Sequence, residues 1–128
     1  VVPNFSIGFL AMARAASAAA GLLPDVQITE AHRPEKLDAP SGTASKLCAT
    51  QGVPLEEVIT LRMRGVTAFH EYKLWGSDDV VTIRHESHGL LSFKEGLLAS
   101  LRYACKSSAF AYGLEEVMGG ACIVRPSP

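Results

Sequence analysis

The chain has 128 residues, of which 48% are apolar and 20% are charged, and its formal net charge is -1. This composition excludes a disordered chain and indicates a single domain, residues 1-128, with a hydrophobic core of its own. The nearly balanced charge excludes a general attraction to nucleic acid or to an anionic membrane, because such binding needs clustered excess Lys and Arg.

The cysteines and the apolar segments indicate a reduced, cytoplasmic setting. Cys48, Cys105 and Cys122 are odd in number and widely spaced, with no CxxC pair, so neither a disulfide framework nor a zinc site is predicted. The apolar segment 7–23 is rich in Ala and carries an arginine and a serine, which is typical of a packed helix and not of a membrane span. Residues 1–4 contain no basic side chain, so no signal peptide is expected.

The first predicted element is a helix over about residues 6–20, capped by Asn4 or Ser6 and ended by Gly21 and Pro24. Its apolar stripe is predicted to consist of Ile7, Leu10, Ala11 and Ala15. Residues 26–31 then alternate in polarity, which is the spacing of a strand. Two prolines and several charges make residues 33–40 a loop. A second helix follows, with Ser41 as its N-cap and Gly52 as its end.

The second half of the chain is rich in β-forming residues. Residues 58–63, 66–75 and 79–86 are predicted strands, and the turn between the last two indicates a hairpin. A helix over 92–106, capped by Ser92, is predicted to bury Phe93, Leu97, Leu98, Leu101 and Ala104. A short helical turn at 114–118 precedes a tail that Pro126 and Pro128 make irregular. This order predicts an α+β fold: a mixed, mostly antiparallel open sheet of about four strands with helices on one face.

The densest group of polar residues, 30–43, runs from the end of a strand to the start of a helix. A helix N-terminus offers unpaired backbone N–H groups and a partial positive charge, and Gly42 lets an anion approach the backbone closely. Thr43 adds a hydroxyl donor, while Arg33 and Lys36 add full positive charges. The segment therefore has the parts of a pocket for an anionic substrate.

His32 is the residue of this segment whose unperturbed pKa lies near neutrality, so it is the natural proton donor. Each residue also has a plainer explanation. A Pro-Ser-Gly-Thr helix start is often only a cap, loop Lys and Arg are usually solvated, and a histidine at a strand end is commonly structural. The spacing alone predicts an anion-binding site with an acid beside it.

The segment EAHRPEKLDAPSGTA, residues 30–44, resembles the substrate signature E-x-H-H-x-x-K-x-D-x-P-S-G-T-A of the dihydrodipicolinate reductase family. Residues 4–8 are similar to the family's hinge sequence. Further similarity is carried by Arg62, Gly65, His70, Glu71, residues 82–85, Ser92, Phe93, Gly96, Gly113 and Leu114. The resemblance covers nearly the whole chain and corresponds to the family's C-terminal domain. The N-terminal Rossmann domain that binds NAD(P)H is therefore expected to be absent from this chain.

The resemblance implies roles for single residues. His32 matches the catalytic histidine, taken as the general acid, and Lys36 matches a lysine that binds substrate and promotes proton transfer. Gly42 and Thr43 match residues that hold a substrate carboxylate. Arg33 stands where the family usually has a second histidine, and it is still able to pair with a carboxylate.

The implied reaction is hydride transfer from NADPH or NADH to 4-hydroxy-tetrahydrodipicolinate (dihydrodipicolinate), giving tetrahydrodipicolinate in lysine and diaminopimelate synthesis. The chain contains neither GxGxxG nor GxxxxGK[ST], so the cofactor is expected to bind mainly to the missing N-terminal domain. The resemblance also implies a homotetramer formed through the open sheet, with strand 66–75 in the interface. Leu90 departs from the family, which usually has an arginine nearby.

Two other functions stay open at this point: a related NAD(P)-dependent amino-acid dehydrogenase, or a non-catalytic anion-binding or assembly module. Among the remaining histidines, His70 is interpreted as packed, whereas His85 and His88 end a strand near the expected site and are left open as substrate or supporting contacts. The aromatic residues of strand 66–75, Phe69, Tyr72 and Trp75, are interpreted as sheet surface or interface packing.

Overall fold

The computed structural model describes residues 1–119, so the prediction for the tail with Pro126 and Pro128 lies outside the described residues. The elements are α1 (Ile7–Ala20), β1 (Asp25–His32), α2 (Gly42–Gln51), η1 (Leu55–Glu57), β2 (Ile59–Arg62), β3 (Ala68–Trp75), β4 (Val80–Ser87), η2 (Leu90–Phe93), α3 (Lys94–Lys106) and α4 (Leu114–Val117). These bounds agree with the predicted elements to within two residues, except that a 3-10 turn replaces the start of the third helix.

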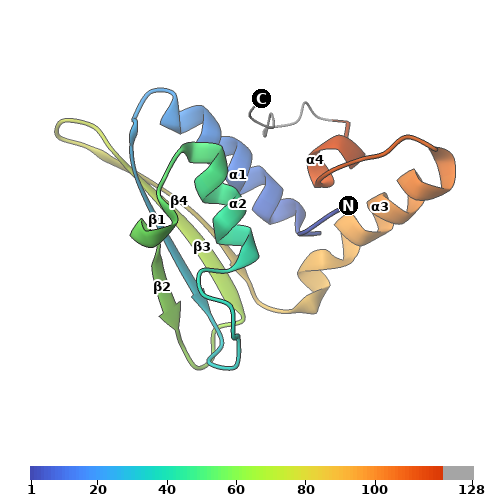
Figure 1. Ribbon diagram of the computed structural model, residues 1–128, viewed down its shortest axis with the longest axis horizontal. Helices are drawn as coiled ribbons and strands as arrows, with labels where there is room; N and C mark the ends of the chain where they lie inside the picture. The colour runs from blue at the N-terminus through green and yellow to red at the C-terminus, as the bar shows by residue number, and fades with distance from the viewer. Residues whose placement is uncertain (120–128) are drawn as a thin grey trace.

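The four strands form one sheet in the order β2-β1-β3-β4. β1 pairs in parallel with β2 and antiparallel with β3, and β3 and β4 form the predicted hairpin. Helices α1 and α2 cover one face of the sheet, whereas α3 and α4 extend to its side (Figure 1). The predicted α+β class and the mixed, mostly antiparallel sheet are confirmed.

Capping side chains set the ends of the two helices that cover the sheet. Ser6 is the N-cap of α1, where its hydroxyl accepts a hydrogen bond from Phe9 N at 3.1 Å. Ser41 is the N-cap of α2 and accepts from Ala44 N at 3.1 Å. At the other end of α2, Gly52 has a φ of 68°, a left-handed conformation that favours glycine.

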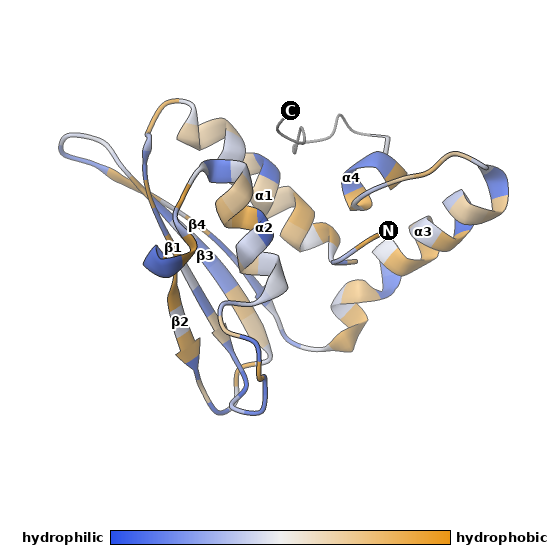
Figure 2. Cartoon of the chain, viewed as in Figure 1, coloured by the Kyte–Doolittle hydropathy of each residue, from blue (hydrophilic) through white to orange (hydrophobic). Residues whose placement is uncertain are grey.

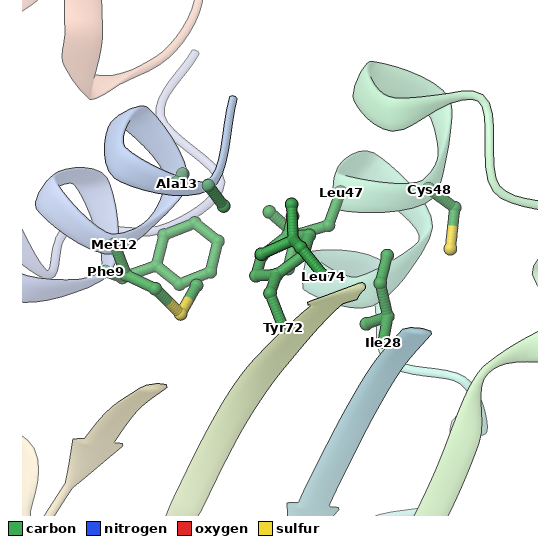
Figure 3. Packing of buried hydrophobic residues seen from close by; sticks show 9 residues of the cluster. Phe9, Met12, Ala13, Ile28, Leu47, Cys48, Tyr72 and Leu74 are labelled. Carbon is green, nitrogen blue, oxygen red and sulfur yellow. The ribbon is translucent and has the colours of Figure 1, made fainter. Parts of the chain in front are cut away.

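The core lies between the covered face of the sheet and the two helices (Figure 3). Ile28 of β1 and Tyr72 and Leu74 of β3 point toward α1 and α2, and none of the three has exposed surface. The helices contribute Phe9, Met12, Ala13, Ala16, Leu47 and Cys48. Burial of one large apolar side chain contributes about 1.5–3 kcal/mol, so this cluster holds the helices against the sheet. Tyr72 is therefore a core residue and does not lie on the sheet surface or in an interface.

The stripe predicted for α1 is wrong at three of four positions, because Leu10 is buried while Ile7, Ala11 and Ala15 are exposed. The buried face is carried by Phe9, Met12, Ala13 and Ala16 instead. An Ala-rich helix is apolar on most sides, so its sequence does not single out the face that packs.

The buried stripe predicted for the third helix is also wrong. Leu97 is 43% exposed and Leu101 is 54% exposed, Ala104 is exposed, and Gly96 is the buried residue of α3. The reason is that α3 runs away from the sheet (Figure 1). Its amphipathic pattern indicates which side of the helix is apolar, but it does not indicate whether another element covers that side. The predicted cap is wrong as well, because Ser92 Oγ donates to Gly89 O within η2.

Among the helices of residues 1–119, none covers the second face of the sheet (Figure 1). The register places Ile59 beside Thr29 and Leu61 beside Ala31, so these residues alternate with the inward-facing Ile28, Glu30 and His32. The apolar character of β2 is visible in Figure 2. None of the helices in residues 1–119 is long and apolar enough to span a membrane.

Candidate active site

A cleft of about 690 Å³ opens where the end of β1, the following loop, the start of α2 and the start of β3 meet the N-terminal segment and η2. Its lining includes His32, Arg33, Lys36, Asp38, Thr43 and His70. Gly42 lines a small cavity next to it, together with Thr43 and Lys46. The structure therefore brings the five predicted site residues to one place, with Gly42 at its edge.

Arg62 of β2 shapes the loop that carries the cationic residues. Its Nε donates to Lys36 O at 3.1 Å, and its Nη2 donates to Asp38 O at 2.6 Å. The parallel pairing of β1 with β2 sets Arg62 opposite His32, and Met63 N donates to His32 O at 2.9 Å. The guanidinium thus holds two carbonyls of the loop, which keeps Lys36 next to the end of β1.

Lys36 is paired with an acid in this arrangement. Its Nζ lies 2.7 Å from Oδ1 of Asp38, and Oδ2 of Asp38 accepts from Gly42 N at 3.4 Å. The hydrogen bond from Lys36 holds the pKa of Asp38 below its usual value. The aspartate carboxylate therefore occupies two of the donors that the sequence assigned to a substrate carboxylate.

His32 is 8% exposed and lies at the inner edge of the cleft. Burial lowers its pKa from the usual 6.5 to about 4. The negative charge of Glu30 opposes this shift, and the nearby ring of His70 and the positive charges of Lys36 and Arg62 add to it. His32 is therefore neutral at pH 7 in the free protein, and the lowered pKa is a property that the sequence does not indicate. Negative charge brought into the cleft raises this pKa again and favours the imidazolium that donates a proton.

Glu30, on the inner face of β1, has no exposed surface. Burial raises the pKa of its carboxyl group, but the nearby ring of His70, the hydrogen bonds from Ser41 and the nearby ring of His32 outweigh burial, and the pKa is about 2. Ser41 N donates to Oε1 at 2.8 Å, and Ser41 Oγ donates to Oε2. The nearest ring nitrogens, His32 Nδ1 and His70 Nε2, lie 3.7 and 3.6 Å from Oε2.

The remaining histidines separate into three environments. His70 is 4% exposed and its ring meets that of His32 edge to face at 5.4 Å, so it is packed as predicted and also lines the cleft. His85 Nε2 lies 3.1 Å from Ser6 Oγ, at the start of α1. His88 is exposed and does not line the cleft. Leu90, at the position of a departure from the family pattern, lines the cleft and is 82% exposed.

Sequence reasoning gave no role to three residues that organise the site: Glu30, Asp38 and Arg62. Glu30 and Asp38 belong to the quoted signature, and their acidic character within a cation-rich segment was the available signal. The sequence points to Arg62 only through its similarity to the family. Its contact with the loop depends on the parallel β1–β2 pairing, which local patterns do not reveal.

Comparison with known proteins gives a consistent result. Residues 7–118 match the family described as "Dihydrodipicolinate reductase, C-terminus". The 4-hydroxy-tetrahydrodipicolinate reductases of Lysinibacillus sphaericus and Streptococcus uberis are 34% and 32% identical, with 92% of this chain and 54% and 56% of the relatives covered. The chain spans about half the length of these relatives.

A solved structure has the same fold. It is a dipicolinate-bound dihydrodipicolinate reductase from Paenisporosarcina sp. TG-14, with a TM-score of 0.76 and 31% sequence identity. The match covers 91% of this chain and 53% of that one. A family match over most of the described residues and a structural match of this extent lead to one conclusion: the chain belongs to the dihydrodipicolinate reductase family, to whose C-terminal part it corresponds.

Proposed function

We propose that residues 1-128 form the substrate-binding domain of a reductase that converts 4-hydroxy-tetrahydrodipicolinate to tetrahydrodipicolinate: the 4-hydroxyl group leaves as water, and the ring gains a hydride from NAD(P)H and a proton. The observation that carries this proposal is the convergence of His32, Lys36, Gly42 and Thr43 at one cleft. The dipicolinate-bound relative supports a planar dicarboxylate as the ligand class. The pathway assigned is lysine and diaminopimelate synthesis, in the cytoplasm, where Cys48 and Cys105 stay reduced as the free thiols they are here.

Each site residue has a task in binding. One carboxylate of the substrate accepts hydrogen bonds from Gly42 N and from the Thr43 hydroxyl at the start of α2, where the helix dipole also favours an anion. Lys36 supplies a full positive charge. Arg33, exposed at the rim of the cleft, pairs with the second carboxylate.

Proton transfer is the task of His32. A dianionic substrate adds negative charge beside a ring that is neutral when the cleft is free, so binding favours uptake of a proton. His32 then donates this proton to the reduced substrate as general acid. Lys36 lies on the same loop and stabilises the negative charge that develops on the ring before the proton arrives.

The described residues do not fit a dinucleotide. No glycine-rich turn joins a strand to a helix in residues 1–119, and the α2 start follows a loop held by Arg62 and Glu30. We assign NADPH or NADH to a separate N-terminal domain, which when loaded supplies the hydride. This chain then contributes substrate orientation and the proton.

We further assign assembly into a homotetramer to the uncovered face of the sheet. Ile59 is 47% exposed, Leu61 38%, Trp75 40% and Val80 51%, and the strand register sets all four on that face. Exposed apolar residues on a face without a helix are the surface that a second copy of the chain is able to cover.

The decisive experiment is a reduction assay. A fusion is made in which this chain follows the N-terminal half of the Lysinibacillus sphaericus relative, and oxidation of NADPH is followed with 4-hydroxy-tetrahydrodipicolinate as substrate. We expect turnover, a loss in kcat of about 100-fold or more in His32→Ala with little change in KM, and no loss in the matched control His88→Ala. Absence of turnover in a folded fusion that binds NADPH contradicts the proposed reaction, and normal turnover in His32→Ala contradicts the acid assignment.

A further inference from the structure

Glu30 lies next to two parts of the site that have different functions: the proposed proton donor and the start of α2. Its Oε1 accepts from Ser41 N at 2.8 Å and from Thr60 Oγ1 at 3.3 Å, and its Oε2 accepts from Ser41 Oγ. The same Oε2 is the oxygen nearest to His32 Nδ1 and His70 Nε2, at 3.7 and 3.6 Å. One buried carboxylate thus lies next to both the proposed proton donor and the start of α2.

We propose that Glu30 is a positioning residue, whose carboxylate fixes the ring of His32 and the N-cap of α2 in one arrangement. The proposal rests on the function proposed above, because it gives Glu30 a task in that reaction. Glu30 does not line the cleft, so it acts through His32 and Ser41 and not on the substrate.

The first half of the argument concerns the histidine ring. Within residues 1–119, Nδ1 of His32 and Nε2 of His70 are buried and have no hydrogen-bond partner in standard geometry, and the carboxylate of Glu30 is the acceptor that both face. An ionised carboxylate only accepts hydrogen bonds, so each facing nitrogen carries the hydrogen. For His32 this selects the Nδ1–H tautomer and leaves Nε2 as the nitrogen that gains and releases a proton.

The second half concerns the start of α2. Ser41 Oγ accepts from Ala44 N as the N-cap while it donates to Glu30. These two hydrogen bonds fix the orientation of the capping hydroxyl. Gly42 and Thr43 follow directly, and the N–H of Gly42 points outward to Asp38. Because the Glu30 carboxylate fixes the start of α2, these donors already point toward a bound carboxylate. Ligand binding therefore loses little conformational entropy in this segment.

A metal ion is the competing explanation of the same cluster. One ligand atom each from Glu30, His32 and His70 lies within 4.8 Å of the others. Both oxygens of Glu30, however, already accept hydrogen bonds from Ser41, and Oε1 also accepts from Thr60. An ion would have to displace these bonds, so the observations favour the hydrogen-bonded arrangement.

The test uses the 128-residue chain labelled with ¹⁵N at histidine. Nitrogen NMR at pH 7 distinguishes the two neutral tautomers, and we expect His32 to be protonated at Nδ1. In Glu30→Gln the side-chain amide presents a donor to the ring, so His32 is expected to shift to the Nε2–H tautomer. Affinity for pyridine-2,6-dicarboxylate, measured by calorimetry, is expected to fall by no more than threefold, because the amide oxygen keeps the bond from Ser41 N and the Ser41 hydroxyl still accepts from Ala44 N as the cap.

Further variants separate the two tasks. Ser41→Ala is expected to keep the Nδ1–H tautomer but to weaken dicarboxylate binding at least fivefold. Glu71→Gln, an acid on the opposite face of the sheet, is the matched control and is expected to change neither readout. If Glu30→Gln does not fold, Glu30→Asp serves instead and is expected to retain the Nδ1–H tautomer because it retains the charge.

Three outcomes overturn the proposal: an Nε2–H tautomer in the wild type, an unchanged tautomer in a folded Glu30→Gln variant, or stoichiometric binding of Zn²⁺ at micromolar concentration that Glu30→Gln abolishes. None of the tautomer measurements depends on hydride transfer. A chain that has the expected tautomers but does not bind the dicarboxylate therefore contradicts the proposed function and not the arrangement around Glu30.

Discussion

Lys36 Nζ lies 2.7 Å from Oδ1 of Asp38, so the lysine assigned to the substrate is already paired with an anion of its own loop. The second oxygen of Asp38 accepts from Gly42 N at 3.4 Å. An exposed ion pair of this kind is weak and easily exchanged. The aspartate therefore acts as a resting counter-ion that an incoming carboxylate has to displace or to share.

The first prediction concerns this counter-ion. Asp38→Asn removes a negative charge from the cleft lining, where it repels a dianion, while the amide retains hydrogen-bonding capacity. We expect the chain to bind pyridine-2,6-dicarboxylate about threefold to tenfold more tightly in calorimetry. Glu35→Gln, an exposed acid of the same loop that does not line the cleft, is the control and is expected to have little effect. Weaker binding by Asp38→Asn would mean that the aspartate orients Lys36 for the ligand.

A second prediction concerns pH. The pKa of His32 is about 4 in the free protein, and a dianionic ligand raises it. A ligand that raises a pKa binds with uptake of protons, so its affinity increases as the pH falls below the raised pKa of the complex toward the free value of about 4. Calorimetry in buffers of different ionisation enthalpy measures the proton uptake directly. In His32→Gln we expect binding without this pH dependence, and a dependence that survives the substitution would assign it to another group.

A third prediction follows from the packing of α3 against the N-terminal segment. A Cβ added to Gly96 would lie 1.9 Å from the carbonyl oxygen of Phe5, which is backbone and unable to move aside cheaply. Gly96→Ala is expected to destabilise the fold by about 1–3 kcal/mol, as overpacking does. It also displaces Phe5, which lines the cleft, so ligand affinity falls too. Urea unfolding measures the first effect, with Gly89→Ala, where a Cβ meets nothing within 4 Å, as the neutral control.

A fourth prediction tests the uncovered sheet face. Leu61→Glu places a charge at the centre of the exposed apolar residues of β2, and a buried unpaired charge opposes association. Sedimentation of the wild-type chain is expected to give a tetramer, and that of Leu61→Glu a smaller species. Leu101→Glu alters a similarly exposed leucine on α3 and is expected to leave the tetramer intact. Dissociation by the α3 substitution alone would move the interface to that helix.

The sequence predicts the elements of this fold because their signals are local. Ser41 and Gly52 mark the two ends of α2 through a side-chain cap and a left-handed turn, both of which depend on a few neighbouring residues. The exposure of Leu97 and Leu101 is not predictable in this way, because it depends on which elements lie across from α3. Local patterns describe a helix, and tertiary contacts decide what covers it.

The same distinction between local signals and tertiary contacts applies to the site. The types of residue at His32, Lys36 and Thr43 are sufficient to indicate an acid beside an anion cradle. The pKa of His32 cannot be predicted from residue types, because it depends on burial and on groups that strand pairing brings near from β2 and β3. For the same reason the sequence presents Glu30 only as part of a signature, since its partner Ser41 lies eleven residues away along the chain.

The two-residue period of β1 has a consequence for how this domain can vary. Glu30 and His32 face the helices, while Thr29 and Ala31 face the uncovered side, so one strand serves two surfaces that do not touch. Point substitutions on one surface are free to accumulate without disturbing the other. An insertion or deletion of one residue in β1 exchanges the two sets and disables both at once. Natural variation in this strand should therefore consist of replacements at constant length.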